Sequence, residues 1–308
     1  MMLFFGSGEG AKRVNEELAF RLGARGWCVS QLQEKLNIRA DGRFGPQTYE
    51  AVAAVEKSLG REAHGTADSA VFAACNLPWP DEFERALALV AELEGTSFDD
   101  CNAADIDGAG LTMGICGFTT RHGEVQALVE TFLREVPEGW QALPASFQNA
   151  IKALIERSAP PGAWEKVLLD ASRCPRREIR TAITAWGQHP LMRQLQISWA
   201  RTRFWEPACR AAELLGVSCS SGRAFLLDVW VQNGGWREGH NRRLHRLCPS
   251  GANTSIDERL RAMALAVAGE AKECWRADVL SRKLLFARGA GMVHGTFYSL
   301  VAQAVTTL

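Results

Sequence analysis

The sequence lacks net charge, because 35 lysine and arginine residues balance 35 aspartate and glutamate residues in 308. A neutral chain is not steered toward nucleic acid or an anionic membrane, so neither is an expected partner. No apolar run approaches the ~20 residues that a membrane span needs. The opening stretch MMLFFGSGEGAKR has no basic region of the kind that starts a secretory signal. We expect a monomer made in the cytoplasm that reaches any outside target through another release system.

Motifs of several common chemistries are also missing. The nine cysteines form no C-x-x-C pair, which argues against a disulfide framework or a zinc knuckle. No G-x-S-x-G stretch marks a serine nucleophile. The glycine-rich stretch DIDGAGLTMGICGF contains no lysine and no G-x-G-x-x-G pattern, so a phosphate cradle is a poor interpretation. No metal and no cofactor is expected.

A change in composition near residue 77 suggests two parts. Pro78 and Pro80 in NLPWPDEFER disfavour helix just before them. We predict a small module over residues 1–76, a linker over 77–82 and a larger domain over 83–308. The larger domain is long enough to bury a substantial core.

The first part has the pattern of short helices. VSQLQEKL and TYEAVAAVEKSL each place apolar residues on one helical stripe. Between them, Asp41-Gly42 favours a turn, and Gly45-Pro46 ends it and begins the next helix. A generic helix-loop-helix would also fit this pattern.

The same stretch carries a specific resemblance. LQEKLNIRADGRFGPQTYEAV resembles the first repeat of the common peptidoglycan-binding module, whose hallmark is D-G-x-F-G-P-x-T. That resemblance implies a three-helix bundle that holds the bacterial cell wall. It also implies a set of wall-binding residues, namely Asp41, Gly42, Phe44 and Gly45.

A helix that ends in a carboxylate follows the two prolines. In PDEFERALALVAELEG, Phe83, Leu87 and Val90 share a stripe with Glu94, and Gly95 is placed to end the helix. Burial on this stripe and the negative end of the helix both favour a protonated carboxyl, as a general acid needs. The plainer alternative is a glutamate that reaches solvent beside the helix end.

The glycine-rich stretch has the pattern of a strand or hairpin with few side chains along one edge. Bare backbone of this kind lets a ligand approach closely. A polymer cleft that holds two carboxyls would suit a glycosidase, in which one carboxyl protonates the leaving oxygen and the other is ionised. Asp107 is the candidate partner of Glu94, and its competitors are Asp99, Asp100 and Asp105.

The order of these residues resembles a known family. A glutamate at a helix end followed by D-G-x-G-x-T-x-G-I-x-G-F is similar to the family 46 chitosanases and their lysozyme-superfamily relatives, including phage lysozymes. The resemblance implies that Glu94 is the general acid, Asp107 the base, and Thr112 a residue that holds the attacking water. Among the aspartates, Asp107 alone is followed by the family's glycine spacing.

The resemblance also implies further site residues. Glu124 matches an acidic position with which chitosanases grip glucosamine, and Gly114 and Phe118 are the other expected substrate-binding residues. A weaker likeness toward the C-terminus implies a buried pair, Asp228 and Arg282, that tunes Glu94. An ordinary core ion pair is the alternative.

The resulting prediction is a mainly α protein. A small three-helix wall-binding module precedes a lysozyme-like α+β catalytic domain with a short β-hairpin at its cleft. The expected activity is that of a muramidase that cleaves the β-1,4 MurNAc–GlcNAc bond of peptidoglycan with inversion. The expected setting is a phage endolysin released by a holin. A chitosanase, a secreted interbacterial toxin and a non-catalytic wall-binding protein are the alternatives.

Overall fold

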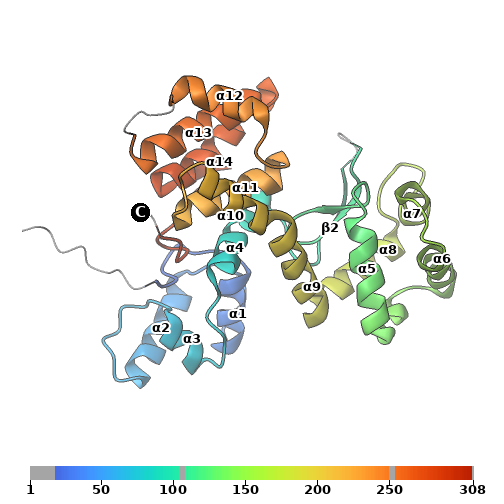
Figure 1. Cartoon of the computed structure of the whole chain (residues 1–308). Coiled ribbons are helices and arrows are strands. Elements are labelled where there is room, and N and C mark those ends of the chain that lie inside the picture. The colour runs from blue at the N-terminus through green and yellow to red at the C-terminus, as the bar shows by residue number, and fades with distance from the viewer. Residues whose placement is uncertain (1–17, 105–107, 250–253, 307–308) are drawn as a thin grey trace, which may run out of the picture.

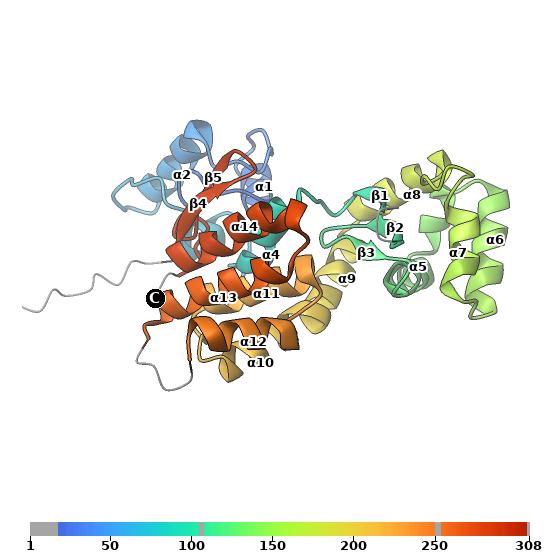
Figure 2. The ribbon, with the colours of Figure 1, turned by 90° about the horizontal axis from the view of Figure 1, so that it is seen from above.

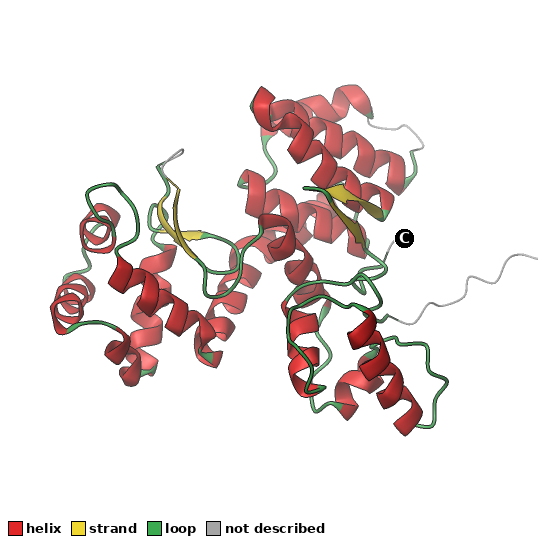
Figure 3. Ribbon diagram, turned by 180° about the vertical axis from the view of Figure 1, so that it is seen from behind, coloured by secondary structure: helices red, strands yellow, loops and turns green. Residues whose placement is uncertain are grey.

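A computed structural model describes residues 18–104, 108–249 and 254–306, and helices dominate it (Figures 1 and 3). The predicted mainly helical, lysozyme-like fold is confirmed. No helix within these described ranges combines the length and apolar character of a membrane span.

Three short helices form the N-terminal part, as the sequence predicted: α1 (Trp27–Lys35), α2 (Pro46–Ser58) and α3 (Ser69–Ala74). Helix α2 begins directly after Gly45, and Pro46 takes the first helical position, where its missing N–H costs no hydrogen bond. Helix α3 begins after Asp68, whose carboxylate accepts a 3.0 Å hydrogen bond from the Val71 N–H.

This part packs directly against the rest of the chain. Its apolar core extends from Phe20 to Ala88, which belongs to the next helix. Phe20 also forms a β-bridge with Gln303, near the other end of the chain. In the predicted linker, Trp79 packs edge-on against Phe20 and Phe72, with ring centroids 5.6 and 5.1 Å away. Residues 77–82 therefore do not form a free tether, because an aromatic side chain anchors them.

Helix α4 (Glu82–Glu94) runs through the middle of the molecule (Figures 1 and 2). A reciprocal capping box between Asp81 and Glu84 fixes its start. Gly95 ends it with a left-handed φ of 67°, which glycine adopts without strain. The helix packs against α1 on one side and α11 on another. Its last residue, Glu94, is therefore held at a fixed place.

The predicted hairpin is part of a three-stranded antiparallel sheet. Its strands, in order, are β1 (Cys101–Ala104), β2 (Gly110–Met113) and β3 (Phe118–Thr119). Thr112 lies opposite Asn102 on one side and Thr119 on the other. The helices beside the sheet are α5 (Glu124–Glu135), η1 (Pro137–Ala142), α6 (Ala145–Glu156), α7 (Pro161–Leu168) and α8 (Arg177–Gln188).

One continuous helical segment connects the sheet side to the remaining helices (Figure 2). It consists of α9 (Pro190–Ala200), a π-helical turn η2 (Arg201–Trp205) and α10 (Glu206–Leu214). Pro207 is the second residue after the π turn, which ends at Trp205. Because proline has no N–H and its ring clashes with a carbonyl of the preceding turn, it explains the wider turn before it.

The C-terminal part completes the helical body. Its elements are α11 (Ser220–Asn233), α12 (Glu238–Leu247), α13 (Ile256–Glu270), η3 (Glu273–Trp275), α14 (Arg276–Arg288), β4 (Ala290–Val293) and β5 (Thr296–Ser299). Helices α11 and α14 pack against each other, and α11 packs against α4. The antiparallel β4–β5 pair was not predicted from the sequence.

Candidate active site

Glu94 is the last residue of α4, and a quarter of its side chain is exposed (25%). Its Oε1 atom accepts a 2.7 Å hydrogen bond from Nη2 of Arg282, which comes from α14. A carboxylate that is both anchored and partly exposed suits a role in chemistry better than a role in packing.

Behind Glu94 lies a buried cluster of charged side chains. Arg282 donates to Asp228 as well as to Glu94, so the expected Asp228–Arg282 contact is present. Lys283 donates to the other oxygen of Asp228 and, over 2.8 Å, to Oε1 of Gln232. The side chains of Asp228, Arg282 and Lys283 are 0, 2 and 0% exposed. Lys283 was not predicted as a member of this cluster, because the direction of its side chain depends on how α14 packs against α11.

The charges of this cluster depend on one another. Burial would raise the pKa of Asp228, but Arg282 and Lys283 together hold it below the ordinary value. Burial lowers the pKa of Lys283 to about 8, although Asp228 opposes that shift. The cations of Arg282 and Lys283 therefore balance the carboxylates of Asp228 and Glu94, and removal of Asp228 would leave buried Lys283 without a charged partner.

The other predicted catalytic residues belong to the sheet side. Thr112 is partly exposed on β2, and its Oγ1 donates a 3.3 Å hydrogen bond to the Asn102 carbonyl. Asp107, the predicted base, lies outside the described residues, as does its competitor Asp105. Gly108, the next residue, has a φ of 70° and open space where a Cβ would stand.

Glu124 has a different environment from the one expected. It is the first residue of α5 and only 5% exposed. Its Oε2 accepts a 2.9 Å hydrogen bond from the Thr119 N–H, and its Oε1 lies 3.3 Å from Nε of Arg203 in the π turn. Both carboxylate oxygens have partners within the protein, so Glu124 connects α5 to β3 and to the π turn η2. Sequence reasoning missed Arg203, which lies 79 residues away.

Two expected substrate-binding residues are instead part of the interior. Phe118 has no exposed surface and stacks on Phe204, with ring centroids 6.3 Å apart. Gly114 is buried, and a Cβ there would stand 2.2 Å from Oε1 of Gln196. That same amide oxygen accepts a hydrogen bond from the Ile115 N–H. Close packing with Gln196 therefore explains this glycine, and substrate contact by Gly114 and Phe118 stays a prediction.

The residues assigned to wall binding build a turn around Gln33. Its amide oxygen accepts a 2.8 Å hydrogen bond from the Gly42 N–H, and its Nε2 donates to Asp41 over 3.0 Å. Phe44 is 2% exposed and lies in the core of the N-terminal part, while Gly45 caps α2. Of the four, Asp41 has an exposed side chain, and hydrogen bonds from Arg43 and Gln33 lower its pKa.

The comparison with known proteins bears on this arrangement. Residues 98–247 match Glycosyl hydrolase family 46. The matched range contains Thr112, Glu124 and Asp228, whereas Glu94 and Arg282 lie outside it. No curated protein matches the chain.

Two solved structures are similar to this chain. A chitosanase of Gynuella sunshinyii in complex with chitotetraose is 16% identical, with a TM-score of 0.50, and the likeness covers 72% of this chain and 98% of that one. The chitosanase of Bacillus subtilis MY002 is 17% identical, with a TM-score of 0.48, over 68% of this chain and 86% of the other. The family match supports a glycoside hydrolase, and the first likeness supports the fold.

Proposed function

We propose that this protein is an inverting glycoside hydrolase that cleaves β-1,4 bonds in a polymer of amino sugars. The observation that carries the proposal is the partly exposed Glu94 at the end of α4, anchored through Arg282 to buried Asp228. The match to Glycosyl hydrolase family 46, which acts with inversion, supports it.

In the proposed mechanism, Glu94 protonates the glycosidic oxygen. Arg282 donates to Oε1 of Glu94, which leaves Oε2 as the oxygen that delivers the proton. Asp107 takes a proton from water on the opposite face of the sugar, and Thr112 orients that water. Inversion requires room for this water, and the carboxyls of inverting enzymes stand about 6.5–9.5 Å apart.

Chitosan is the first substrate to test. The solved structures with a similar fold are named as chitosanases, and one of them holds chitotetraose. The proposed reaction is then hydrolysis between glucosamine units, with each cut releasing a new reducing end.

Peptidoglycan is the second candidate, and two observations favour it. The turn from Asp41 to Gly45 has the hallmark of a wall-binding module and leads into the second of three helices. The Glu124 carboxylate is also paired with Arg203, which removes an anionic grip that a cationic glucosamine chain would use. With this substrate the protein would act on the cell wall, either as a phage endolysin or as a toxin delivered by a secretion system.

The deciding experiment measures the fragments released from two polymers. The protein is incubated with chitosan and, separately, with purified sacculi, and the products are identified by mass spectrometry. Glucosamine oligomers support the first substrate, and muropeptides with a reducing MurNAc end support the second. Glu94→Gln is the matched control, because it keeps the size and the Arg282 contact but cannot donate the acid proton. If neither polymer yields fragments, the protein is not this hydrolase, and a non-catalytic wall-binding role becomes the better explanation.

A further inference from the structure

Arg203 lies in the π-helical turn η2, and more than half of its side chain is exposed (54%). Its Nε atom is 3.3 Å from Oε1 of Glu124, whose side chain is 7% exposed. Among the residues that the structure describes, its two terminal nitrogens, Nη1 and Nη2, have no hydrogen-bond partner. A ligand that approaches this pair therefore meets the guanidinium and not the carboxylate.

Two steps connect Arg203 to the strand that carries Thr112. Oε2 of Glu124 accepts a 2.9 Å hydrogen bond from the Thr119 N–H, and Thr119 lies directly opposite Thr112 in the register of β2 and β3. Residues that face each other across antiparallel strands have Cβ atoms about 4.5–5.5 Å apart. Arg203 is therefore held close to the residue that is proposed to orient the attacking water.

Cys116 connects the same region to Glu94. Burial raises the pKa of the Cys116 thiol, and the negative charges of Glu94 and Glu124 raise it further. Charges shift a pKa in this way when they lie near the group that titrates. Both carboxylates therefore lie near one cysteine, and Arg203, which is paired with Glu124, belongs to the surroundings of Glu94.

The two free nitrogens of Arg203 suit one kind of ligand. The terminal nitrogens of a guanidinium donate in a planar fork that matches the two oxygens of a carboxylate. An ammonium group at the same place would be repelled by the like charge. Of the two candidate polymers, chitosan carries ammonium groups, whereas peptidoglycan carries carboxylates on its peptide stems or on its free lactyl groups.

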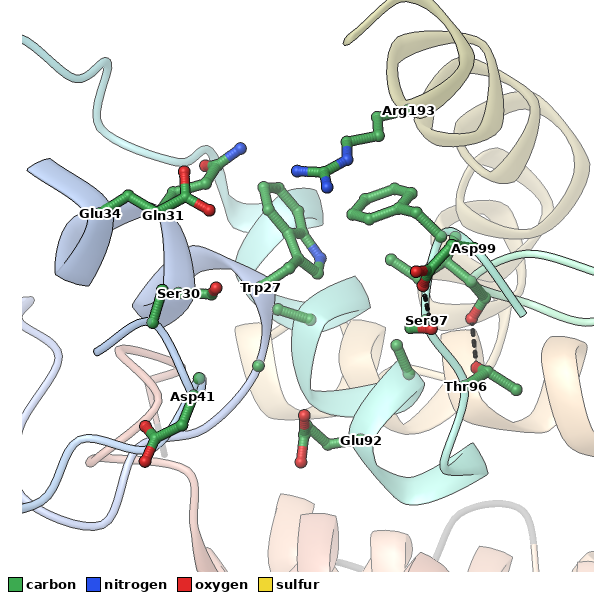
Figure 4. A pocket seen from close by; sticks show the side chains of 17 residues that line it. Trp27, Ser30, Gln31, Glu34, Asp41, Glu92, Thr96, Ser97, Asp99 and Arg193 are labelled. Carbon is green, nitrogen blue, oxygen red and sulfur yellow. Dashed lines mark hydrogen bonds between the residues drawn. The ribbon is translucent and has the colours of Figure 1, made fainter. Parts of the chain in front are cut away.

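The pocket between the N-terminal helices and the larger domain offers the opposite chemistry (Figure 4). Four carboxylates and one guanidinium line it: Glu34, Asp41, Glu92 and Asp99 against Arg193. The guanidinium is already in use, because Nε of Arg193 donates to the Gly187 carbonyl over 3.1 Å and the group lies over the ring of Phe98. A carboxylate on the polymer would be repelled there, so this pocket does not compete with Arg203.

We propose that Arg203 is a specificity-determining residue of the cleft, which binds a carboxylate of the polymer and disfavours a glucosamine unit. Glu124 is then a positioning residue, which holds Nε and leaves Nη1 and Nη2 available. This role rests on the proposed function, because the polymer is the substrate of the same site. It narrows the substrate class to amino-sugar polymers that bear carboxylates.

The test measures binding by the full-length Glu94→Gln protein, which cannot consume its ligands. Isothermal titration calorimetry gives the Kd for four tetrasaccharides. Two bear carboxylates, namely a GlcNAc–MurNAc tetramer with free lactyl groups and the same tetramer with its peptide stems. The other two are fully N-acetylated chitotetraose, which is uncharged, and chitotetraose, which is cationic. One of the carboxylate-bearing tetramers should bind most tightly and chitotetraose least tightly, and the comparison within the first pair identifies which carboxylate is held.

Variants of Arg203 separate recognition from structural support. Arg203→Gln should weaken binding of the preferred carboxylate-bearing tetramer by roughly 5-fold, as for a partly exposed charge pair. It should leave the uncharged tetramer unchanged and strengthen binding of chitotetraose, because the repelling charge is gone and Glu124 is free. Arg203→Lys keeps the charge without the fork, so it should still disfavour chitotetraose. Arg242→Gln is the matched control, since Arg242 is an exposed arginine beside a glutamate on α12, and it should change none of the four Kd values.

Opposite changes for the anionic and the cationic tetramer are the decisive result, because damage to the fold would weaken all four. Equal changes for every tetramer, no change in any, or no binding at all overturns the role of Arg203. Hydrolysis of sacculi and of chitosan by the wild type is measured separately. Discrimination that depends on Arg203 without hydrolysis refutes only the proposed function, and hydrolysis without such discrimination refutes only the role of Arg203.

Discussion

Replacing Asp228 by asparagine tests the charge balance behind Glu94. The variant keeps the shape of the side chain but removes the buried negative charge that Arg282 and Lys283 share. Arg282 keeps Glu94 as a partner, whereas Lys283 keeps only the neutral Gln232. Breaking a buried ion pair costs about 3–5 kcal/mol in the free energy of unfolding. No discount for solvent screening applies, because all three side chains are at most 2% exposed.

The loss should depend on pH, and the direction follows from Lys283. Its pKa in the folded protein is about 8, below its ordinary value, so the charged form is the one that Asp228 stabilises at pH 6. At pH 9 most of the wild-type Lys283 is neutral, and the wild type has less interaction to lose. In Asp228→Asn the pKa of Lys283 falls further, so the folded variant binds fewer protons than the unfolded chain and its stability rises with pH. We expect a difference of about 3–5 kcal/mol at pH 6 and a smaller one at pH 9.

Urea unfolding at both pH values measures this difference. Asp278→Asn is the matched control on α14, since that carboxylate is 28% exposed and should contribute only about 0–1 kcal/mol. A second variant, Asp228→Asn with Lys283→Met, should recover part of the stability, because it removes the orphaned cation. A loss below about 1 kcal/mol, or one of equal size at both pH values, would refute the coupling of Asp228 with Lys283.

Three further predictions concern catalysis and packing. Glu94→Gln should lower the rate of hydrolysis by about 10²–10⁴-fold with an unchanged circular dichroism spectrum, and a near wild-type rate would exclude Glu94 as the acid. Proton NMR of the first product of a β-linked substrate should show the α-anomer, whereas a β-product would make Asp107 a nucleophile. Gly114→Ala should lower the melting temperature, because φ is 75° and the new Cβ would meet Gln196; an unchanged melting temperature would show that this contact relaxes freely.

Features set by local sequence were predictable. The end of α4 at Gly95 and the start of α2 at Pro46 follow from neighbouring residues alone, and the structure has both. The position of Glu94 at a helix end was predictable for the same reason.

Features that depend on residues far away in the sequence were not predictable. Gly114 and Glu124 were interpreted as substrate contacts, but their environments depend on Gln196 and Arg203, about 80 residues further along the chain. Nothing in the glycine-rich stretch itself indicates that these partners approach it. The same limit applied to Lys283, whose contact with Asp228 exists only once α11 and α14 have packed together.

The bridge between Phe20 and Gln303 has a consequence for the order of folding. Arg21 donates its N–H to the Ala302 carbonyl over 3.1 Å, and Arg85 donates to the Ala304 carbonyl over 2.8 Å. The N-terminal helices are therefore made first by the ribosome but gain these contacts last, after residues 302–304 have been synthesised. A stop codon placed just before residue 302 would remove none of those helices, yet it would remove the carbonyl groups that accept hydrogen bonds from Arg21 and Arg85. Sensitivity of the N-terminal part to proteases would then report on damage at the opposite end of the chain.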